Sequence, residues 1–152
     1  IDAVYSSGLQ RAHYAAQIVA GERSLPLHVR LGLRERMFGD WQGKSWEEIR
    51  RISPEPFEAY LKDFLTARIP GDGESYFQVR DRVMPVVEEA VGEGAGRTVA
   101  MVSHAGVIRV ILTEALGMPL RNLFRFQLDY ASLSIVDFHP NGRRVVRLVN
   151  GL

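Results

Sequence analysis

Apolar and polar residues follow one another along the chain in an order that predicts strands succeeded by helices. Residues 1–5 are apolar like a buried strand, and residues 9–20 carry apolar side chains at helical spacing until Gly21. The same order returns later, because the apolar run 98–102 precedes a second helically spaced segment at 107–116. Each unit therefore consists of a strand, a turn and a helix, which is typical of a parallel sheet.

The segment between these two units is predicted to be mainly loop and helix. Residues 25–33 alternate loosely, as in a second strand or an extended stretch, and the Gly-rich residues 34–43 suggest a loop. Ser45 and Glu48 have the spacing of a capping box, in which the serine caps a helix and the glutamate binds back to its backbone N–H. We expect a short helix from there to about Ile52.

Prolines and a second cap divide the rest of this region. Pro54 and Pro56 are expected to interrupt the helical pattern, which resumes over residues 57–65. Ser75 is expected to cap a further helix that runs to about Val91.

Two β-rich runs close the chain, at residues 132–138 and 143–149, and the residues between them are typical of a hairpin turn. Strands that alternate with helices, followed by a hairpin, predict an α/β fold. We expect a three-layer sandwich: a mostly parallel sheet with helices on both faces and a C-terminal antiparallel hairpin.

The amino-acid composition excludes several kinds of site and partner. The chain has 152 residues, which predicts a single domain, and it contains no cysteine. No two of its four histidines have the i, i+4 spacing of a helical metal pair, so we expect neither a metal site nor a cofactor. A formal charge of +1 and the lack of a long apolar run argue against nucleic-acid and membrane partners. We expect a cytoplasmic protein, since nothing at the start resembles a signal peptide.

Three residues could carry chemistry. His104 lies where the strand at 98–102 meets the next helix, the edge at which open α/β sheets bind ligands and at which helix N–H groups attract anions. Arg11 has the equivalent place after the first strand, and a guanidinium can hold a phosphate by two parallel hydrogen bonds. Glu35 lies in a loop with aromatic neighbours and could act as a general acid. The alternatives are a capping histidine, a surface arginine and an exposed charged loop.

Four segments together resemble the histidine phosphatase superfamily, also called the phosphoglycerate-mutase-like family. They are residues 4–12, 33–43, 73–75 and 102–109, which occur in the family's order and extend over most of the chain. The resemblance implies an α/β sandwich with a phosphate pocket at the carboxyl edge of the sheet.

The resemblance also implies roles for individual residues. Arg11 matches a phosphate-binding arginine of the family, Glu35 matches the acid, and His104 matches the second histidine of the pocket. We expect the backbone of Ala105 to contact the phosphate as well. Supporting positions around this site are predicted at Ser7, Ser103 and Glu74.

One defining motif of the family is missing. The Arg-His-Gly sequence that supplies the nucleophilic histidine occurs nowhere in residues 1–152. The resemblance therefore implies a single domain, 1–152, that lacks its N-terminal strand and helix, with a gap in the middle of the sheet. We expect this chain alone to bind oxyanions weakly and to hydrolyse almost nothing.

The implied activity is hydrolysis of a phosphomonoester through a phosphohistidine. The short separation between Glu35 and His104 favours a phosphatase over a mutase, whose family members carry a long insertion there. Residues 33–48 and 122–138 look most like those of the bacterial α-ribazole phosphatases of cobalamin synthesis. A mutase-type phosphotransferase and a catalytically dead phospholigand-binding domain remain alternatives. The expected partner is a small phosphorylated metabolite, and a homodimer is left open.

Overall fold

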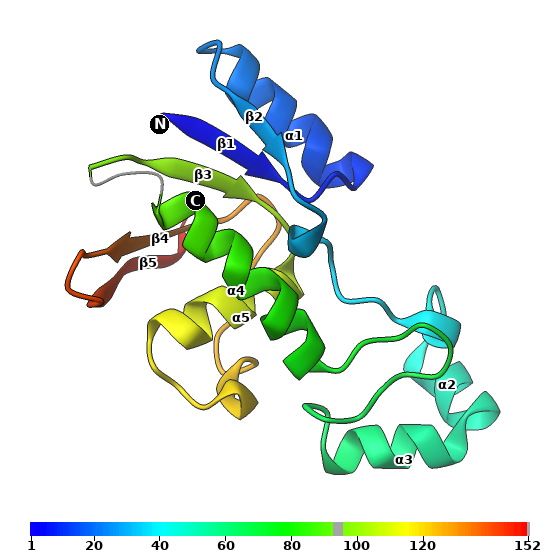
Figure 1. The fold of residues 1–152 in the computed structure, drawn as a ribbon. Coiled ribbons are helices and arrows are strands. Elements are labelled where there is room, and N and C mark those ends of the chain that lie inside the picture. Colours follow the sequence, from blue (N-terminus) through cyan, green and yellow to red (C-terminus); the bar gives the residue numbers. More distant parts are fainter. Residues whose placement is uncertain (93–95, 152) are drawn as a thin grey trace.

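A parallel sheet forms the centre of the molecule. The structure is a computed structural model that describes residues 1–92 and 96–151. The sheet contains β1 (Ala3–Ser6), β2 (Leu27–Val29) and β3 (Val99–Val102) in the order β2-β1-β3, all parallel. All four residues of β1 are buried, as expected for the central strand (Figure 1).

Helices cover both faces of this sheet. On one face, α1 (Gln10–Gly21) packs through Ala16 and Ala20 against Val4. On the other face, α4 (Tyr76–Gly92) and α5 (Ala105–Ala115) enclose the strand residues of opposite parity, among them Tyr5. Successive residues of a strand point to opposite faces, so one short strand supports both layers. The predicted α/β sandwich is confirmed.

The C-terminal hairpin forms a sheet of its own. Strands β4 (Leu133–Phe138) and β5 (Arg144–Gly151) are antiparallel, as predicted. Within the part of the chain that the structure describes, β3 pairs only with β1, and β4 pairs only with β5. The hairpin therefore lies beside the rest of the fold without continuing the parallel sheet (Figure 1).

Apolar side chains on β3 and β4 are incompletely covered. All four residues of β3 are only half-buried, although the sequence Val-Ala-Met-Val is typical of a strand covered on both faces. On β4, Leu133 is 56% exposed and Ile135 is 38% exposed. The parallel sheet thus ends at a poorly covered strand, β3, and the hairpin at another, β4; we call this arrangement the divided sheet.

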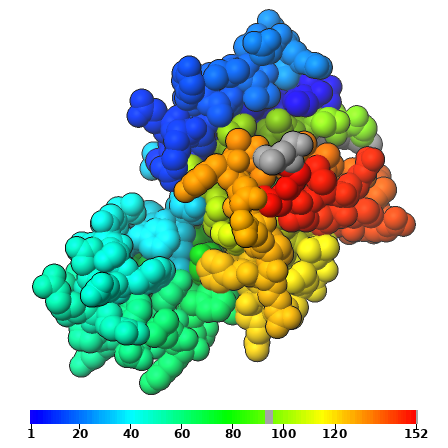
Figure 2. Space-filling view, turned by 180° about the vertical axis from the view of Figure 1, so that it is seen from behind, coloured from blue at the N-terminus to red at the C-terminus, as the bar shows by residue number. Residues whose placement is uncertain are grey.

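A helical lobe projects from the sandwich (Figure 2). It contains the short 3₁₀ turn η2 (Gly39–Trp41), α2 (Trp46–Ile52) and α3 (Pro54–Lys62). The lobe has a small apolar core of its own, formed by Trp41, Ile49, Phe57 and Ile69. The predicted capping box of α2 is present, since Ser45 and Glu48 bond reciprocally.

The expected interruption of the helical pattern is present, but it falls at Ser53, and the next helix begins at Pro54 instead of residue 57. Pro54 is the first residue of α3, where a missing N–H costs nothing because the first turn has no intrahelical acceptors for its N–H groups. The helix also ends at Lys62, before the predicted Leu65. The Asp63 carboxylate accepts hydrogen bonds from the N–H of Leu65 and the hydroxyl of Thr66, which stabilises a turn instead.

The second strand is shorter than the predicted 25–33. It ends at Val29, and a 3₁₀ turn, η1 (Leu31–Leu33), follows. Gly32 lies so close to α4 that a Cβ atom there would meet the carbonyl oxygen of Arg82 at 2.6 Å. The absence of a side chain on Gly32 thus lets η1 pack directly against α4. After β3, helix α5 begins at Ala105, earlier than predicted.

The remaining predictions agree within a few residues. Ser75 caps α4, because its hydroxyl accepts the N–H of Gln78 and its own N–H donates to the Gln78 side chain. Another short turn, η3 (Leu120–Asn122), follows α5. Across the described residues, no helix has the length and hydrophobicity needed to cross a membrane.

Candidate active site

His104 lies at the carboxyl end of β3, in the residue before α5. Its side chain makes no capping bond to that helix, and it is 7% exposed. The Nε2 atom lies 2.8 Å from the Oγ of Ser7, which follows β1. The same Oγ accepts the N–H of Leu9 at 3.2 Å. Ser7 thus fixes the imidazole between the ends of two neighbouring strands.

The surroundings of His104 favour its neutral form. Burial lowers the pKa of the imidazole below 6.5, and the positive charge of Arg11 lowers it further, while Glu35 acts in the opposite direction. The ring is therefore largely uncharged at neutral pH. An arriving anion would reverse this balance, because a negative charge beside the ring favours protonation.

Glu35 is anchored at the N-terminus of α5. Its Oε1 accepts the N–H of Arg36 at 2.9 Å, and its Oε2 accepts the N–H of Gly106 at 3.3 Å. The carboxyl oxygens thereby satisfy an N–H group of the first helical turn, which has no acceptor within the helix. An added Cβ on Gly106 would lie 2.4 Å from Oε1, so any side chain there would have to displace the Glu35 carboxyl.

Arg11 reaches the same edge from the first turn of α1. The side chain is exposed, and none of the groups in residues 1–92 and 96–151 accepts a hydrogen bond from its guanidinium. Its charge is nevertheless close enough to influence the pKa of His104. Ala105 adds a backbone N–H as the first residue of α5. The structure therefore brings together Arg11, Glu35, His104 and Ala105.

The other predicted positions hold the loops around this site. The Ser103 hydroxyl donates to the carbonyl of Leu33 at 2.7 Å, which joins the end of β3 to η1. The Glu74 carboxylate accepts the N–H of Met37 at 2.9 Å and pairs with Arg82. Burial would raise the pKa of Glu74, but the hydrogen bonds from Arg82 and Met37 outweigh it and hold the pKa below its usual value.

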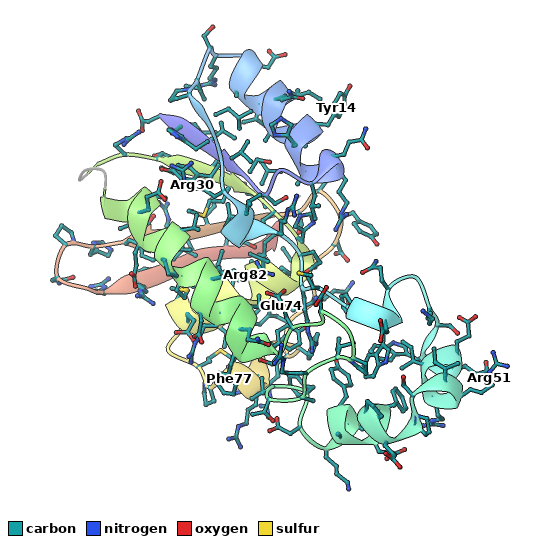
Figure 3. All side chains as sticks on the ribbon, turned by 45° about the vertical axis from the view of Figure 1, so that its right-hand side comes forward. Tyr14, Arg30, Arg51, Glu74, Phe77 and Arg82 are labelled. Atoms are coloured by element: carbon teal, nitrogen blue, oxygen red, sulfur yellow. The ribbon has the colours of Figure 1, made fainter. Side chains whose placement is uncertain are left out.

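Two arginines near the site were not predicted from the sequence to be site residues. Arg82 on α4 lies beside Glu74 (Figure 3) and hydrogen-bonds to the segment that carries Glu35. Arg36 is 2% exposed, donates from Nε to the carbonyl of Glu74, and stacks 4.3 Å from the ring centroid of Tyr76. The sequence held one signal, since Arg82 has the helical spacing of the apolar residues Val79 and Val86 on α4.

The arrangement is suited to an anion. A guanidinium, an imidazole and the N-terminus of α5 face one edge of the sheet, together with one carboxyl group. Among the described residues, no group of three or more His, Asp or Glu side chains is placed to hold a metal ion. His28 lies apart from these groups and stacks on Tyr5 at 4.8 Å.

Comparison with known proteins decides the family. The model of the histidine phosphatase superfamily (branch 1) matches residues 1–151. The chain belongs to the histidine phosphatase superfamily. It is 39% identical over 150 residues to the bifunctional protein Rv2228c of Mycobacterium tuberculosis, a match that covers 99% of this chain and 41% of that protein. The chain thus spans about two fifths of the length of that curated relative.

Solved structures of this superfamily share the fold. The α-ribazole phosphatase of Shigella flexneri superimposes with a TM-score of 0.87 at 28% identity, over 99% of this chain and 73% of that one. A mycobacterial glucosyl-3-phosphoglycerate phosphatase in complex with inorganic phosphate superimposes with a TM-score of 0.83 at 29% identity, over 98% of this chain and 76% of that one.

Proposed function

We propose that this chain carries the acid and phosphate-binding half of a phosphomonoester hydrolase that acts through a phosphohistidine. The observation that carries the proposal is the meeting of Glu35 and His104 at the N-terminus of α5, with Arg11 within electrostatic reach. These groups could bind a phosphate dianion and supply a proton to its leaving group. Membership of the histidine phosphatase superfamily supports the same chemistry.

The proposed reaction has two steps. In the first, a neutral histidine attacks phosphorus, an N–P bond forms, the ester P–O bond breaks, and Glu35 gives its proton to the departing alkoxide. In the second, Glu35 takes a proton from water, whose oxygen attacks phosphorus and releases phosphate and the free histidine. Arg11, His104 and the N–H of Ala105 would neutralise the phosphate oxygens in both steps. Each close charge pair contributes up to ~4 kcal/mol before desolvation is counted.

We assign the nucleophile to polypeptide outside residues 1–152, since no Arg-His-Gly motif occurs within them. The divided sheet supports this assignment. β3 and β4 each pair on one side only, and both leave apolar residues half-covered or exposed. One further strand between them would join the two sheets and would end at the edge where His104 and Glu35 lie. On this proposal, 1–152 is a single domain without its N-terminal strand and helix.

The proposed substrate is a small phosphorylated metabolite, and α-ribazole phosphate is the first one to test. The structural similarity to the Shigella α-ribazole phosphatase supports that choice. The absence of the Arg-His-Gly motif favours a second candidate, a domain that binds phosphorylated ligands without turnover.

Calorimetry and turnover measurements on two proteins would separate these functions. The isolated chain 1–152 should bind inorganic phosphate weakly and hydrolyse almost no α-ribazole phosphate. The natural polypeptide that contains this sequence should have a mass several kilodaltons above 17.1 kDa and should hydrolyse phosphomonoesters. Phosphate binding by both proteins, with turnover by neither, would establish the binding domain instead. Fast hydrolysis by the isolated chain would refute the assignment of the nucleophile.

A further inference from the structure

Arg82 connects α4 to the segment that carries Glu35. Its side chain leaves α4 next to η1 and lies beside Glu74 (Figure 3). Nη1 donates to the carbonyl oxygens of Gly32 at 2.6 Å and Arg34 at 2.7 Å, and Nη2 donates to the carbonyl of Glu35 itself at 3.2 Å. Three carbonyls within four consecutive residues thus converge on one guanidinium.

Glu74 completes this connection from the opposite side. Arg82 donates to its two carboxylate oxygens at 2.6 Å from Nε and 2.8 Å from Nη2, a side-on pairing with two parallel bonds. The carboxylate also accepts the N–H of Met37, and the backbone N–H of Glu74 donates to the Met37 carbonyl. The loop is therefore held on both sides of Glu35, by Arg82 before it and by Glu74 after it.

Arg82 and Glu74 are both shielded from water, which strengthens the hydrogen bonds between them. The Arg82 side chain is 24% exposed and the Glu74 side chain 14%, so water competes weakly for their hydrogen bonds. Position 35 itself has no apolar anchor, because its side chain is the carboxyl that faces the site, although Leu33 two residues earlier is fully buried. The backbone carbonyl of Glu35 is held by the Arg82 guanidinium.

We infer that Arg82 is a positioning residue for the general acid: by holding the carbonyls of Gly32, Arg34 and Glu35 it places the Glu35 carboxyl on the N–H of Gly106. Lysine cannot replace it, since a single ammonium cannot reach three carbonyls and both oxygens of Glu74 at once. This inference rests on the proposed function for the role of Glu35, but not for the contact with Gly106.

The test compares Arg82→Lys with Arg80→Lys in the natural polypeptide. Arg80 is on the same helix, is more exposed and pairs with its neighbour Asp81, so it is the matched control. Turnover is measured on phosphomonoesters with good and poor leaving groups. We expect Arg82→Lys to lower turnover of poor leaving groups about 10- to 100-fold and of good ones much less, since only the former need the acid. Arg80→Lys should change neither.

A double variant shows whether the effect passes through Glu35. In a Glu35→Gln background, Arg82→Lys should add no further leaving-group dependence, because the acid is already absent. Equal losses for all leaving groups, or a full additional loss in the double variant, would show that Arg82 acts only on stability and would overturn the inference.

A spectroscopic measurement keeps the inference separate from the proposed function. The amide resonance of Gly106 in isolated 1–152 reports the Glu35 contact. Arg82→Lys should shift this resonance in the direction produced by Glu35→Gln, and Arg80→Lys should leave it in place. An unmoved Gly106 amide in Arg82→Lys overturns the inference even if the enzyme is a phosphatase. A shifted amide, together with no turnover by the natural polypeptide, supports the positioning and removes the phosphatase.

Discussion

Gly106 and Glu35 are in contact at a position on α5 where any side chain would displace the carboxyl. The carboxyl of Glu35 accepts the Gly106 N–H, and a Cβ on Gly106 would lie 2.4 Å from Oε1. The helix residue therefore specifies the position of the acid as much as the loop does. In sequence the two residues are far apart, and only the fold places them together.

Replacing this glycine separates catalysis from stability. Gly106→Ala should displace the Glu35 carboxyl and lower turnover of poor leaving groups about 10- to 100-fold. The free energy of unfolding should change by less than about 1 kcal/mol, because alanine favours the helix by roughly the amount that the displaced contact costs. Kinetics with a leaving-group series and urea unfolding measure the two effects.

Gly21→Ala is the control for that variant, since nothing lies within 4 Å of a Cβ at Gly21. It should leave turnover unchanged. If Gly106→Ala hydrolysed poor leaving groups as fast as the unmodified protein, the contact would have no part in the reaction.

Glu35→Gln tests the general acid directly. The amide keeps the size of the carboxyl but has no proton to give to an alkoxide, so esters with poor leaving groups should lose far more turnover than esters with good ones. Binding of inorganic phosphate should persist, because Arg11 and His104 remain. The same loss for every leaving group would remove the assignment of Glu35.

His104 should respond to phosphate through its pKa. Burial and Arg11 hold the pKa of the free imidazole below 6.5, and a bound phosphate dianion should raise it. Ring resonances of His104, followed by NMR from pH 5 to 8 with and without inorganic phosphate, measure both values. A titration that phosphate does not move would place the anion away from this histidine.

The lowered pKa also links His104 to stability. The unfolded chain binds a proton at this residue more readily than the folded one, so stability rises with pH wherever the two differ. The contribution is complete above about pH 6.5 and is lost as the pH falls through the folded-state pKa. His104→Gln should flatten this dependence in acid unfolding curves, whereas His139→Gln, in the exposed hairpin turn, should keep it.

The divided sheet gives a prediction about hydrogen exchange. In isolated 1–152, β1 amides should be strongly protected because β1 pairs on both sides, whereas β3 and β4 should contain rapidly exchanging amides at their unpaired edges. In the natural polypeptide these same amides should become protected. Protection of β3 equal to that of β1 in the isolated chain would contradict the proposed missing strand.

The sequence was sufficient for elements whose signals are local. The cap at Ser45 needs only Glu48, three residues on, and the cap at Ser75 needs only Gln78, so short-range chemistry set both helix starts. Pro54 shows the limit of such signals. A proline marks a boundary, but whether it ends one helix or begins the next depends on the conformation of Ser53 before it.

The residues that hold the site could not be found in this way. Arg82 bonds to carbonyls about fifty residues away in sequence, and every residue has a carbonyl, so nothing in the segment 32–35 marks it as the partner. Ser7 and His104 are likewise joined only because β1 and β3 are neighbours in the sheet. The candidate chemical groups could be named from the sequence, but their contacts could be determined only from the fold.

The central claim is that Arg11 and His104 form the phosphate site of a phosphomonoester hydrolase. The most direct test is turnover of a phosphomonoester by the natural polypeptide carrying Arg11→Ala or His104→Ala, beside His139→Ala as the control. The account predicts that each of the first two variants loses at least about 100-fold in kcat/KM, while the control keeps its full rate. Unchanged turnover in Arg11→Ala and His104→Ala would contradict it.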